Sequence, residues 1–508
     1  MPAPDNCIQI EQQLFNPLET AYEESPGSSM CSSTFSESPK PSLPEIAESQ
    51  FNKPPYDQKP DPFLQAYPAH TFTPTDFALL EHYLEHTSKD LTVDNGDQYA
   101  LQIGIPNLAL QSKPLMRSLL AFSAICKCND IISQTPVSPA NRDKVLELLS
   151  TADRYHMESL REIQHTLSEV RHYDHILANA AMMGMYGSGS HCIRIWLAGS
   201  AAGGKKLGGG FGPKSCQWIS LFRAVRVAYG GLMNVNGACG VNGKVRIRLA
   251  SDATLVGTSQ QRREPLDHPL YPILAATVAS AMAKLDKKAS EIASDMSRVQ
   301  TDNKLGGFRD WGSSAVHSDS DLQACLTALE LFRNIVGETF PTKSANSVAL
   351  DDRSRRFEDD GNPMDQIPNI SPWMRRYTAS ITSTVPSRLP RRFIMAFIHK
   401  APTRYLELIE EMIGFILGGE PVECLFGSAE PGLAHQLAME IFVHWLVLVL
   451  MLDNVWWIGA TGAWELGQIV ASRRDGQWRG WLLNQEGDWW PGSMLEISRQ
   501  LDKYREKT

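Results

Sequence analysis

Apolar and polar positions recur with a helical period along most of the chain from residue 73 onward. The spacing of three and four residues is clearest over 143–170, where a single gap is filled by His156. Side chains at that spacing share one face of an α-helix, which must then pack against the body of the protein. The positions that define this face are Val145, Leu149, Ala152, Leu160, Ile163, Leu167 and Val170.

A first helix is predicted to begin at Thr73-Pro74-Thr75-Asp76, which offers a side-chain cap for the free amide groups of a helix start. We expect its apolar face to carry Phe77, Leu80, Tyr83 and Leu84. Similar patterns predict further helices over 105–125, 174–186, 193–197, 218–227, 269–299, 321–336, 405–417, 433–452, 463–471 and 493–504.

The most apolar stretch is Leu433–Leu452, which carries a single polar stripe at Gln436, Glu440 and His444. After His444 every residue is apolar, and a helix that is apolar all round must be buried. A membrane span needs about 20 consecutive apolar residues. Because the stripe interrupts one end and Asp453 caps the other, we predict a core helix and no membrane contact. It is followed by Asp453-Asn454-Val455-Trp456-Trp457-Ile458-Gly459.

The chain shows no convincing run of strands, so the predicted fold class is all-α: an irregular multi-helix domain around a buried C-terminal helix. Residues 1–72 are rich in Pro, Ser, Gln and acidic side chains, a composition that predicts a disordered tail. Its few bulky residues among acids fit an activation segment or a passive tail. Residues 73–508 form the predicted helical domain. We expect loops within it at 199–217, 229–262 and 341–369.

Composition narrows the class of protein. Of 508 residues, 43% are hydrophobic and 21% charged, as in soluble globular proteins. A formal net charge of −9 does not indicate nonspecific binding to nucleic acid. Nine scattered cysteines favour reduced thiols inside a cell over a disulfide framework. The first ten residues do not resemble a signal peptide.

One short motif resembles a zinc site. His82-Tyr83-Leu84-Glu85-His86 has the H-x-x-E-H spacing, which could place two imidazoles on one metal ion with Glu85 as base. The simpler interpretation is a surface histidine pair beside a buried Tyr83-Leu84. Because the motif has no defined third ligand, we expect no metal.

The remaining motifs are weaker still. Gly199–Lys206 has the spacing of a phosphate loop, but Lys206 stands where Ser or Thr would bind Mg²⁺, and no strand precedes it. Cys126 and Cys128 fit small buried or half-buried thiols. We therefore predict no catalytic residue, no metal ligand and no cofactor, so the chain is not expected to be an enzyme. Three arginine pairs could serve nuclear import or phosphate contact, or be ordinary solvated charges: Arg355-Arg356, Arg375-Arg376 and Arg391-Arg392.

Several segments, in the same order along the chain, resemble the C-terminal regulatory domain of fungal zinc binuclear cluster transcription factors of the sterol-uptake-control type. The resemblance covers roughly residue 72 to the C-terminus and implies that the H-x-x-E-H helix is a packing element. The segments are Leu79–Ser88, Ile105–Ala109, Leu119–Ala124, Trp456–Gly459, Gly462–Gly467 and Trp489–Pro491.

The resemblance implies a nuclear protein. In the sterol-responsive relatives this body binds a lipid, which implies an apolar pocket between helices for a small apolar ligand, although the lining cannot be named from the sequence. Such factors also carry an N-terminal six-cysteine cluster that holds two Zn²⁺ and reads DNA. Ahead of Thr73 this chain has only Cys7 and Cys31, and two thiols cannot ligate two zinc ions. Direct DNA binding is therefore doubtful: either a DNA-binding partner is used, or the gene model begins downstream of an exon that encodes the cluster.

Two functions are thus expected. The first is a transcriptional regulator of a fungal metabolic pathway, such as a secondary-metabolite or sterol-related one. It would act in the nucleus through its helical domain, as a homodimer or with a DNA-binding partner or the transcription machinery. The alternative is a cytosolic all-α lipid-binding protein or cofactor-free enzyme. Only the first should activate or repress a reporter gene.

Overall fold

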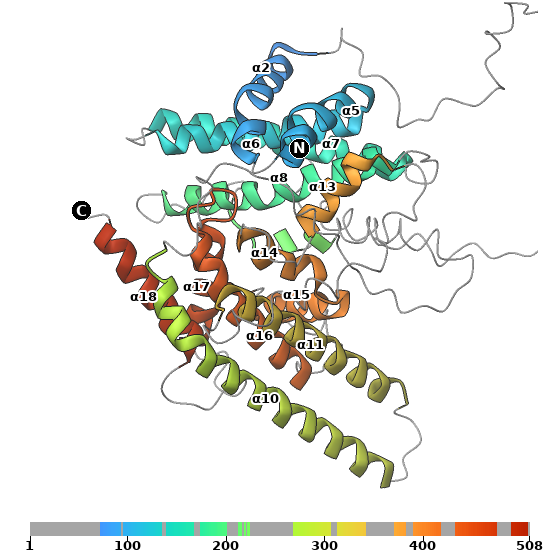
Figure 1. The fold of residues 1–508 in the computed structure, drawn as a ribbon, viewed down its shortest axis with the longest axis vertical. Helices are drawn as coiled ribbons and strands as arrows, with labels where there is room; N and C mark the ends of the chain where they lie inside the picture. The colour runs from blue at the N-terminus through green and yellow to red at the C-terminus, as the bar shows by residue number, and fades with distance from the viewer. Residues whose placement is uncertain are drawn as a thin grey trace, which may run out of the picture.

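The computed structural model is built from helices throughout the part of the chain that it describes (Figure 1). The predicted all-α fold is confirmed for these residues. The predicted tail up to residue 71, the loop 229–262 and most of the other two predicted loops lie outside them. The described residues are 72–92, 95–134, 139–166, 173–200, 212–215, 218–219, 221–223, 268–305, 312–341, 370–382, 390–417, 432–474 and 489–505.

The first half of the described chain contains seven α-helices and two π-helical turns, η3 and η4. They are α2 (Pro74–His82), η3 (Tyr83–Thr87), α3 (Ser88–Leu91), α4 (Asn95–Tyr99), η4 (Ala100–Gly104), α5 (Ile105–Gln111), α6 (Lys113–Ser133), α7 (Pro139–Thr166) and α8 (Tyr173–Gly199).

The second half of the described chain adds eight α-helices and a short 3-10 turn, η8. They are α10 (Tyr271–Leu305), α11 (Gly312–Thr339), α13 (Pro372–Thr382), α14 (Pro390–Lys400), α15 (Thr403–Leu417), α16 (Leu433–Val449), η8 (Leu450–Leu452), α17 (Ala460–Arg474) and α18 (Trp490–Arg505).

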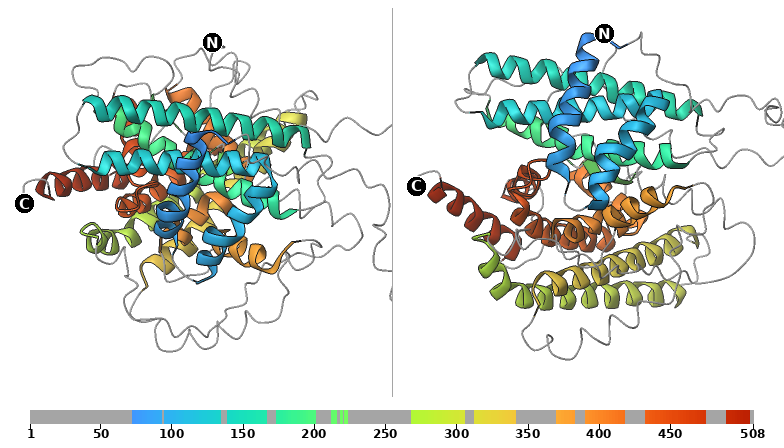
Figure 2. Two further views of the ribbon diagram at one scale, coloured as in Figure 1. Left: turned by 90° about the horizontal axis from the view of Figure 1, so that it is seen from above. Right: turned by 45° about the horizontal axis from the view of Figure 1, so that its top comes forward.

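The buried apolar side chains of the described residues form two clusters, one in each layer of the molecule. The N-terminal cluster is built by α2, α3, α5 to α8 and the two π-helical turns, together with α13. The C-terminal cluster is built by α10, α11 and α14 to α18, with Trp218 and Ile219 added. Figure 2 shows the two layers one above the other, and α8 lies on the side of the N-terminal layer that contacts α13 and α17.

The first helix begins where the sequence predicts. Thr73 Oγ1 accepts a hydrogen bond from the Asp76 amide (3.1 Å), and Asp76 Oδ2 accepts one from the Thr73 amide (2.9 Å). This reciprocal cap satisfies two amide groups that the helix leaves unpaired. Asp76 is itself buried and accepts from the Tyr155 hydroxyl (2.5 Å) and from Arg117 (3.3 Å). The cap therefore also fastens α2 to α6 and α7.

The predicted inner face of this first helix is wrong at two positions. Phe77 and Leu84 are 55% and 41% exposed, whereas Leu79 and Tyr83 are buried. The buried face is offset by one residue from the predicted one: it carries Asp76, Leu79 and Tyr83 at helical spacing, so Phe77 and Leu84 lie at its exposed side. After the turn η3, Leu91 faces the core.

Two predicted helix boundaries are also wrong. The single helix expected over 105–125 is divided at Ser112, whose backbone is extended. Pro114 explains the break, because proline is accepted in the first turn of a helix and disrupts a helix interior. Conversely, the helices expected over 174–186 and 193–197 are one continuous helix, α8.

Glycines within α8 allow close packing, which outweighs their low helix propensity. A Cβ at Gly189 would stand 2.8 Å from the side chain of Ile125 and 3.3 Å from that of Trp456. A Cβ at Gly187 would collide with Leu221. The helices α13 and α14 are not among those predicted, although Phe393, Ile394 and Phe397 of α14 have helical spacing and are buried.

The predicted core helix, α16, lies inside the C-terminal layer and contacts α10, α11, α14, α15, α17 and α18 (Figure 1). Of the most apolar stretch within Leu433–Leu452, 89% is buried inside the protein. This helix therefore packs as core, even though its length and composition would suffice to cross a membrane. Trp445 is fully buried, and its indole Nε1 donates to the carbonyl oxygen of Ile394 (2.8 Å).

The polar stripe of α16 is internal. Glu440 is 1% exposed and accepts from Lys288 Nζ (3.2 Å) on α10 and from Trp489 Nε1 (3.4 Å). His444 donates from Nδ1 to the carbonyl oxygen of Glu440 (2.6 Å) and stacks on Trp490, with ring centroids 5.4 Å apart. Burial lowers the pKa of His444, which keeps its imidazole neutral. The stripe therefore joins α10, α16 and α18.

Candidate functional site

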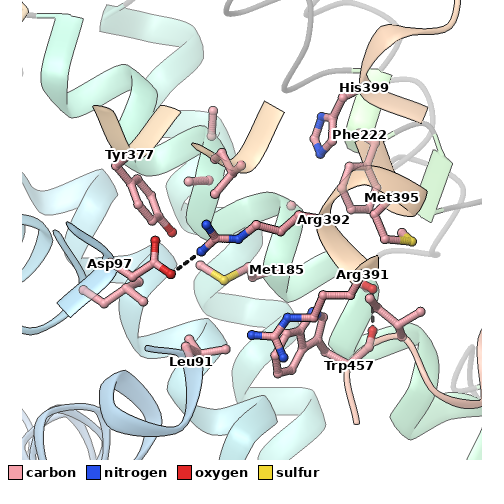
Figure 3. A pocket seen from close by; sticks show the side chains of 17 residues that line it. Leu91, Asp97, Met185, Phe222, Tyr377, Arg391, Arg392, Met395, His399 and Trp457 are labelled. Atoms are coloured by element: carbon pink, nitrogen blue, oxygen red, sulfur yellow. Dashed lines mark hydrogen bonds and ion pairs between the residues drawn. The ribbon is translucent and has the colours of Figure 1, made fainter. Parts of the chain in front are cut away.

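A cavity of about 150 Å³ lies at the seam between the two clusters, and we call it the seam cavity. Its walls come from α3, α4, η4, α8 and α13 of the N-terminal layer on one side and from α14 and the turn after η8 on the other (Figure 3). At roughly 10–15 Å³ of such space per enclosed water, it has room for about ten waters. The described part of the chain thus offers space for a small ligand between its two layers.

Most of the wall is apolar. Two of the apolar lining residues are methionines, Met185 and Met395. Methionine side chains are flexible and polarizable, so they adapt to ligands of differing shape. The apolar lining residues are Leu91, Leu101, Ala180, Ala181, Gly184, Met185, Phe222, Ile381, Met395, Trp457 and Ile458.

An ion pair crosses the seam at one side of the cavity. Asp97, from α4, is 2% exposed and accepts a hydrogen bond from the guanidinium of Arg392, on α14. Arg392 also donates to the hydroxyl of Ser380, on α13. The Tyr377 ring lies beside this pair in Figure 3. Burial, and then the Asp97 charge, raise the pKa of Tyr377, so its phenol stays neutral and can donate or accept a hydrogen bond.

A second guanidinium lies on the other side of the cavity. Arg391 stands over the ring of Trp457, with its Cζ 5.1 Å from the centroid (Figure 3). The attraction between a cation and an aromatic face holds such a pair together. Ser188, on α8, donates to the carbonyl oxygen of Trp457, which fixes the turn against the N-terminal layer.

The turn Asp453–Gly459, here called the tryptophan turn, connects the two layers. Trp456 stacks on Phe122 of α6, with centroids 6.3 Å apart, and Trp457 packs against both clusters. The two adjacent tryptophans thus have different roles: the first packs against the N-terminal cluster and the second lines the cavity.

The H-x-x-E-H motif lies away from the seam cavity and has a packing role in the structure. His82 Nε2 is 2.7 Å from Asp130 Oδ2, and Nδ1 is 3.2 Å from the hydroxyl of Thr87. Glu85 and His86 are exposed. Tyr83 is buried and its hydroxyl donates to the carbonyl oxygen of Leu101 (3.0 Å). Of the buried Tyr83-Leu84 pair that was expected, only Tyr83 is buried, for the reason given above.

No group of three or more potential metal ligands occurs among the described residues. Cys126 and Cys128 are buried in α6, and burial raises the pKa of both thiols, as for inert core cysteines. The residues before the candidate phosphate loop are helical up to Gly199, and positions 201–206 lie outside the described residues.

The arginine pairs have different surroundings. Arg391 and Arg392 both line the seam cavity, Arg376 is exposed on α13, and Arg355-Arg356 lies outside the described residues. The lining of the cavity could not be found from the sequence, because its residues come from segments up to 367 positions apart, from Leu91 to Ile458. One available signal was the Arg391-Arg392 pair, which directly precedes the apolar residues 393–398 of α14.

Comparison with known proteins supports a family for the N-terminal layer. Residues 78–204 match the family described as "Fungal specific transcription factor domain". No match is found among curated proteins or among solved structures. The matched residues include most of the helices that build the N-terminal cluster and one wall of the seam cavity. The match therefore supports the fungal-specific transcription factor domains as the general family of this protein.

Proposed function

We propose that the protein is a nuclear transcriptional regulator of a fungal metabolic pathway, related to the sterol-uptake-control type, whose helical body responds to a small, largely apolar ligand in the seam cavity. The observation that carries the proposal is the match of residues 78–204 to the fungal-specific transcription factor domain, which supports transcriptional regulation. The pathway, the ligand and the sterol-type assignment rest on the resemblance and on the chemistry of the cavity.

The position of the cavity supports a regulatory role. One wall includes matched residues, such as Asp97 and Met185, and the other comes from α14 and the tryptophan turn. A ligand that contacts both walls binds best to one arrangement of the two layers and therefore shifts the population toward it. A partner that contacts both layers would then bind differently with and without ligand, which is allosteric coupling in its thermodynamic sense.

We further propose that the chain reaches DNA through a DNA-binding partner. Residues 1–72 contain two cysteines, Cys7 and Cys31, which are too few for a binuclear zinc cluster, so DNA contact through such a cluster would have to come from other residues, and a partner is one source of them. The acidic, Ser- and Pro-rich composition of these residues fits a segment that recruits the transcription machinery.

The proposal is tested by fusing the full chain to a heterologous DNA-binding domain and measuring a reporter gene in a fungal host. We expect reporter transcription to rise or fall at least severalfold over the DNA-binding domain alone, and a tagged full chain without the fusion to accumulate in the nucleus. A silent reporter with verified expression, or exclusion of the tagged chain from the nucleus, would contradict it.

The cavity also supports a second candidate, a cytosolic lipid-binding protein, because an apolar pocket between helices is a common ligand site. The same two measurements separate the candidates. A cytosolic carrier would bind its ligand, remain outside the nucleus and leave the reporter unchanged.

A further inference from the structure

We infer that the seam cavity takes a single-ring molecule that carries one hydroxyl group, a phenol being the simplest case, and that a sterol does not fit in it. The inference rests on the proposed function only in taking the cavity as a ligand site. It names the size and the polar group of the ligand, which neither the family match nor the apolar lining specifies.

The volume of the cavity sets the size of the ligand. This volume is about 150 Å³, whereas pockets for drug-sized ligands measure about 300–1,000 Å³. An apolar protein cavity of about 150 Å³ holds a benzene molecule. A single ring with one or two small substituents therefore fits, whereas the fused rings of a sterol would require the two layers to separate.

The α8 side of the cavity is lined by small residues. Ala180, Gly184 and Ser188 follow one another at four-residue spacing and therefore lie in one row along the helix, with Ala181 beside them. Where side chains are this small, a ligand can approach the helix backbone closely. This wall therefore offers a shallow surface against which the face of a ring can lie.

The C-terminal layer lines the cavity with larger and softer side chains. Phe222, Met395 and Trp457 belong to this wall. Aromatic rings attract one another in offset-stacked or edge-to-face arrangements, with centroids roughly 4.5–7 Å apart. A methionine sulfur also makes favourable contacts with aromatic rings. The composition of this wall thus favours a ring over a flexible chain of the same volume.

Tyr377 provides a polar group for the ligand. Its side chain lies in the lining and is only 5% exposed. In Figure 3 its hydroxyl end points toward Asp97 and Arg392. The charges of both residues act on the phenol, but neither residue forms a hydrogen bond with it. A phenol can donate or accept, so the Tyr377 hydroxyl can pair with a hydroxyl on the ligand.

Other polar side chains of the lining are already engaged. Arg392 donates to Asp97 and to Ser380. The Ser188 hydroxyl donates to the carbonyl oxygen of Trp457. A ligand hydroxyl would have to compete with these contacts, whereas it can pair with Tyr377 without breaking any of them. The geometry therefore points to Tyr377 as its partner.

The polar group is tested with p-cresol and toluene, which share a ring and a methyl group and differ by one hydroxyl. Binding of each to the purified full chain is measured by isothermal titration calorimetry. Burying a hydroxyl without a partner is unfavourable, so a wholly apolar cavity would prefer toluene. With Tyr377 as partner, we expect p-cresol to bind at least as tightly as toluene. Weaker binding of p-cresol than of toluene, or no binding of either, would overturn the inference.

The size limit is tested with estradiol, which carries the same phenol on the fused-ring body of a steroid. A steroid that fitted the cavity would bury more apolar surface than p-cresol and would therefore bind more tightly. We expect estradiol, at its solubility limit, to leave the p-cresol titration unchanged. Displacement of p-cresol by estradiol would show that the site accepts a sterol-sized ligand and would contradict the inference.

Tyr377→Phe locates the hydroxyl partner, because it removes the phenol oxygen and keeps the ring. We expect the affinity for toluene to be retained and that for p-cresol to fall about tenfold, as for one lost hydrogen bond. If Tyr377→Phe, folded by circular dichroism, kept the full affinity for p-cresol, the assignment to Tyr377 would be wrong.

Ala181→Leu locates the site, because the larger side chain occupies the cavity from α8 and should abolish binding of both probes. Ala279→Leu makes the same change at an exposed position of α10 and should leave both affinities intact. Unchanged binding to Ala181→Leu would place the probes outside the seam cavity and overturn the inference. These results do not depend on the reporter, so a silent reporter would count against the proposed function alone, and probes that fail to bind would leave the reporter result standing.

Discussion

Single buried polar residues fix much of this structure, and His156 shows how. It lies in α7, is 5% exposed, and stacks on Tyr186 with ring centroids 4.1 Å apart. Asp153 and Arg194, one carboxylate and one guanidinium, lie close enough to act on it in opposite directions and are paired with each other at 2.7 Å. Burial is the largest cause and lowers the pKa of His156 from 6.5 to about 4.

This shift predicts a loss of stability in mild acid. Between pH 6.5 and 4 the unfolded chain binds a proton at this position and the folded protein does not, so the free energy of unfolding falls as pH decreases. The expected contribution between pH 7 and pH 5 is on the order of 2 kcal/mol. His156→Phe keeps the ring stacked and should flatten the pH dependence of urea unfolding by about that amount.

The carboxylates with depressed pKa values, such as Asp76 and Asp453, contribute in the same direction only at lower pH, because their stabilisation is lost as pH falls below their ordinary values near 4. His86→Gln removes an exposed imidazole and serves as the matched control. An unchanged slope for His156→Phe between pH 7 and pH 5 would refute this account of the residue.

At the scale of helices, the sequence predicted those with strong apolar periodicity and failed where tertiary contacts decide. The periodic pattern of α7 and the apolar run of α16 were sufficient to predict both helices. The sequence pattern could not reveal the π-helical turn at Tyr83–Thr87, because a wider turn changes the register of the helix without changing the local composition. The pattern predicted two helices within α8, at 174–186 and 193–197, because the packing contacts of Gly187 and Gly189 that accompany one continuous helix are not visible in the sequence.

The candidate site was less predictable than the fold for the same reason. An apolar pocket was expected from the resemblance, but no periodicity brings Asp97 to Arg392, which is 295 positions away. The pair can be recognised only once α4 and α14 are packed together. The buried stripe of α16 is a similar case: the pattern showed Glu440 and His444 but not their partners Lys288 and Trp490.

The Glu440–Lys288 contact gives a prediction at this scale. Glu440→Gln or Lys288→Met leaves one charge buried without its partner, because the side chains are only 1% and 12% exposed. Each single change should lower the free energy of unfolding by about 3–5 kcal/mol. Making both changes removes the charges together and should cost less than the sum of the two, by at least about 1 kcal/mol.

Urea unfolding of the four proteins, measured at one pH, gives the coupling directly. Lys287→Met is the matched control, since this neighbouring lysine is 79% exposed and should change stability by less than about 0.5 kcal/mol. Additive single effects would show that the stripe does not join α10 to α16 as described.

At the scale of the whole molecule, two packed layers meet along α8, α13, α14 and the tryptophan turn (Figure 2). The seam between them contains charged groups, glycine contacts and the cavity, whereas each layer has its own continuous apolar cluster. A ligand bound in such a seam can change how the two layers are arranged relative to each other without unfolding either one.

The central claim is that occupancy of the seam cavity controls transcription, and a cavity-filling variant tests it most directly. Met395→Trp should fill the space from the α14 side, and Leu110→Trp adds the same ring at a leucine that is 50% exposed on α5. Reporter transcription is measured for the full chain tethered to DNA, at matched protein levels and with thermal unfolding as a check on folding. We predict that Met395→Trp changes reporter output by about fivefold or more while Leu110→Trp matches the unsubstituted chain. Equal output from all three proteins would contradict the account.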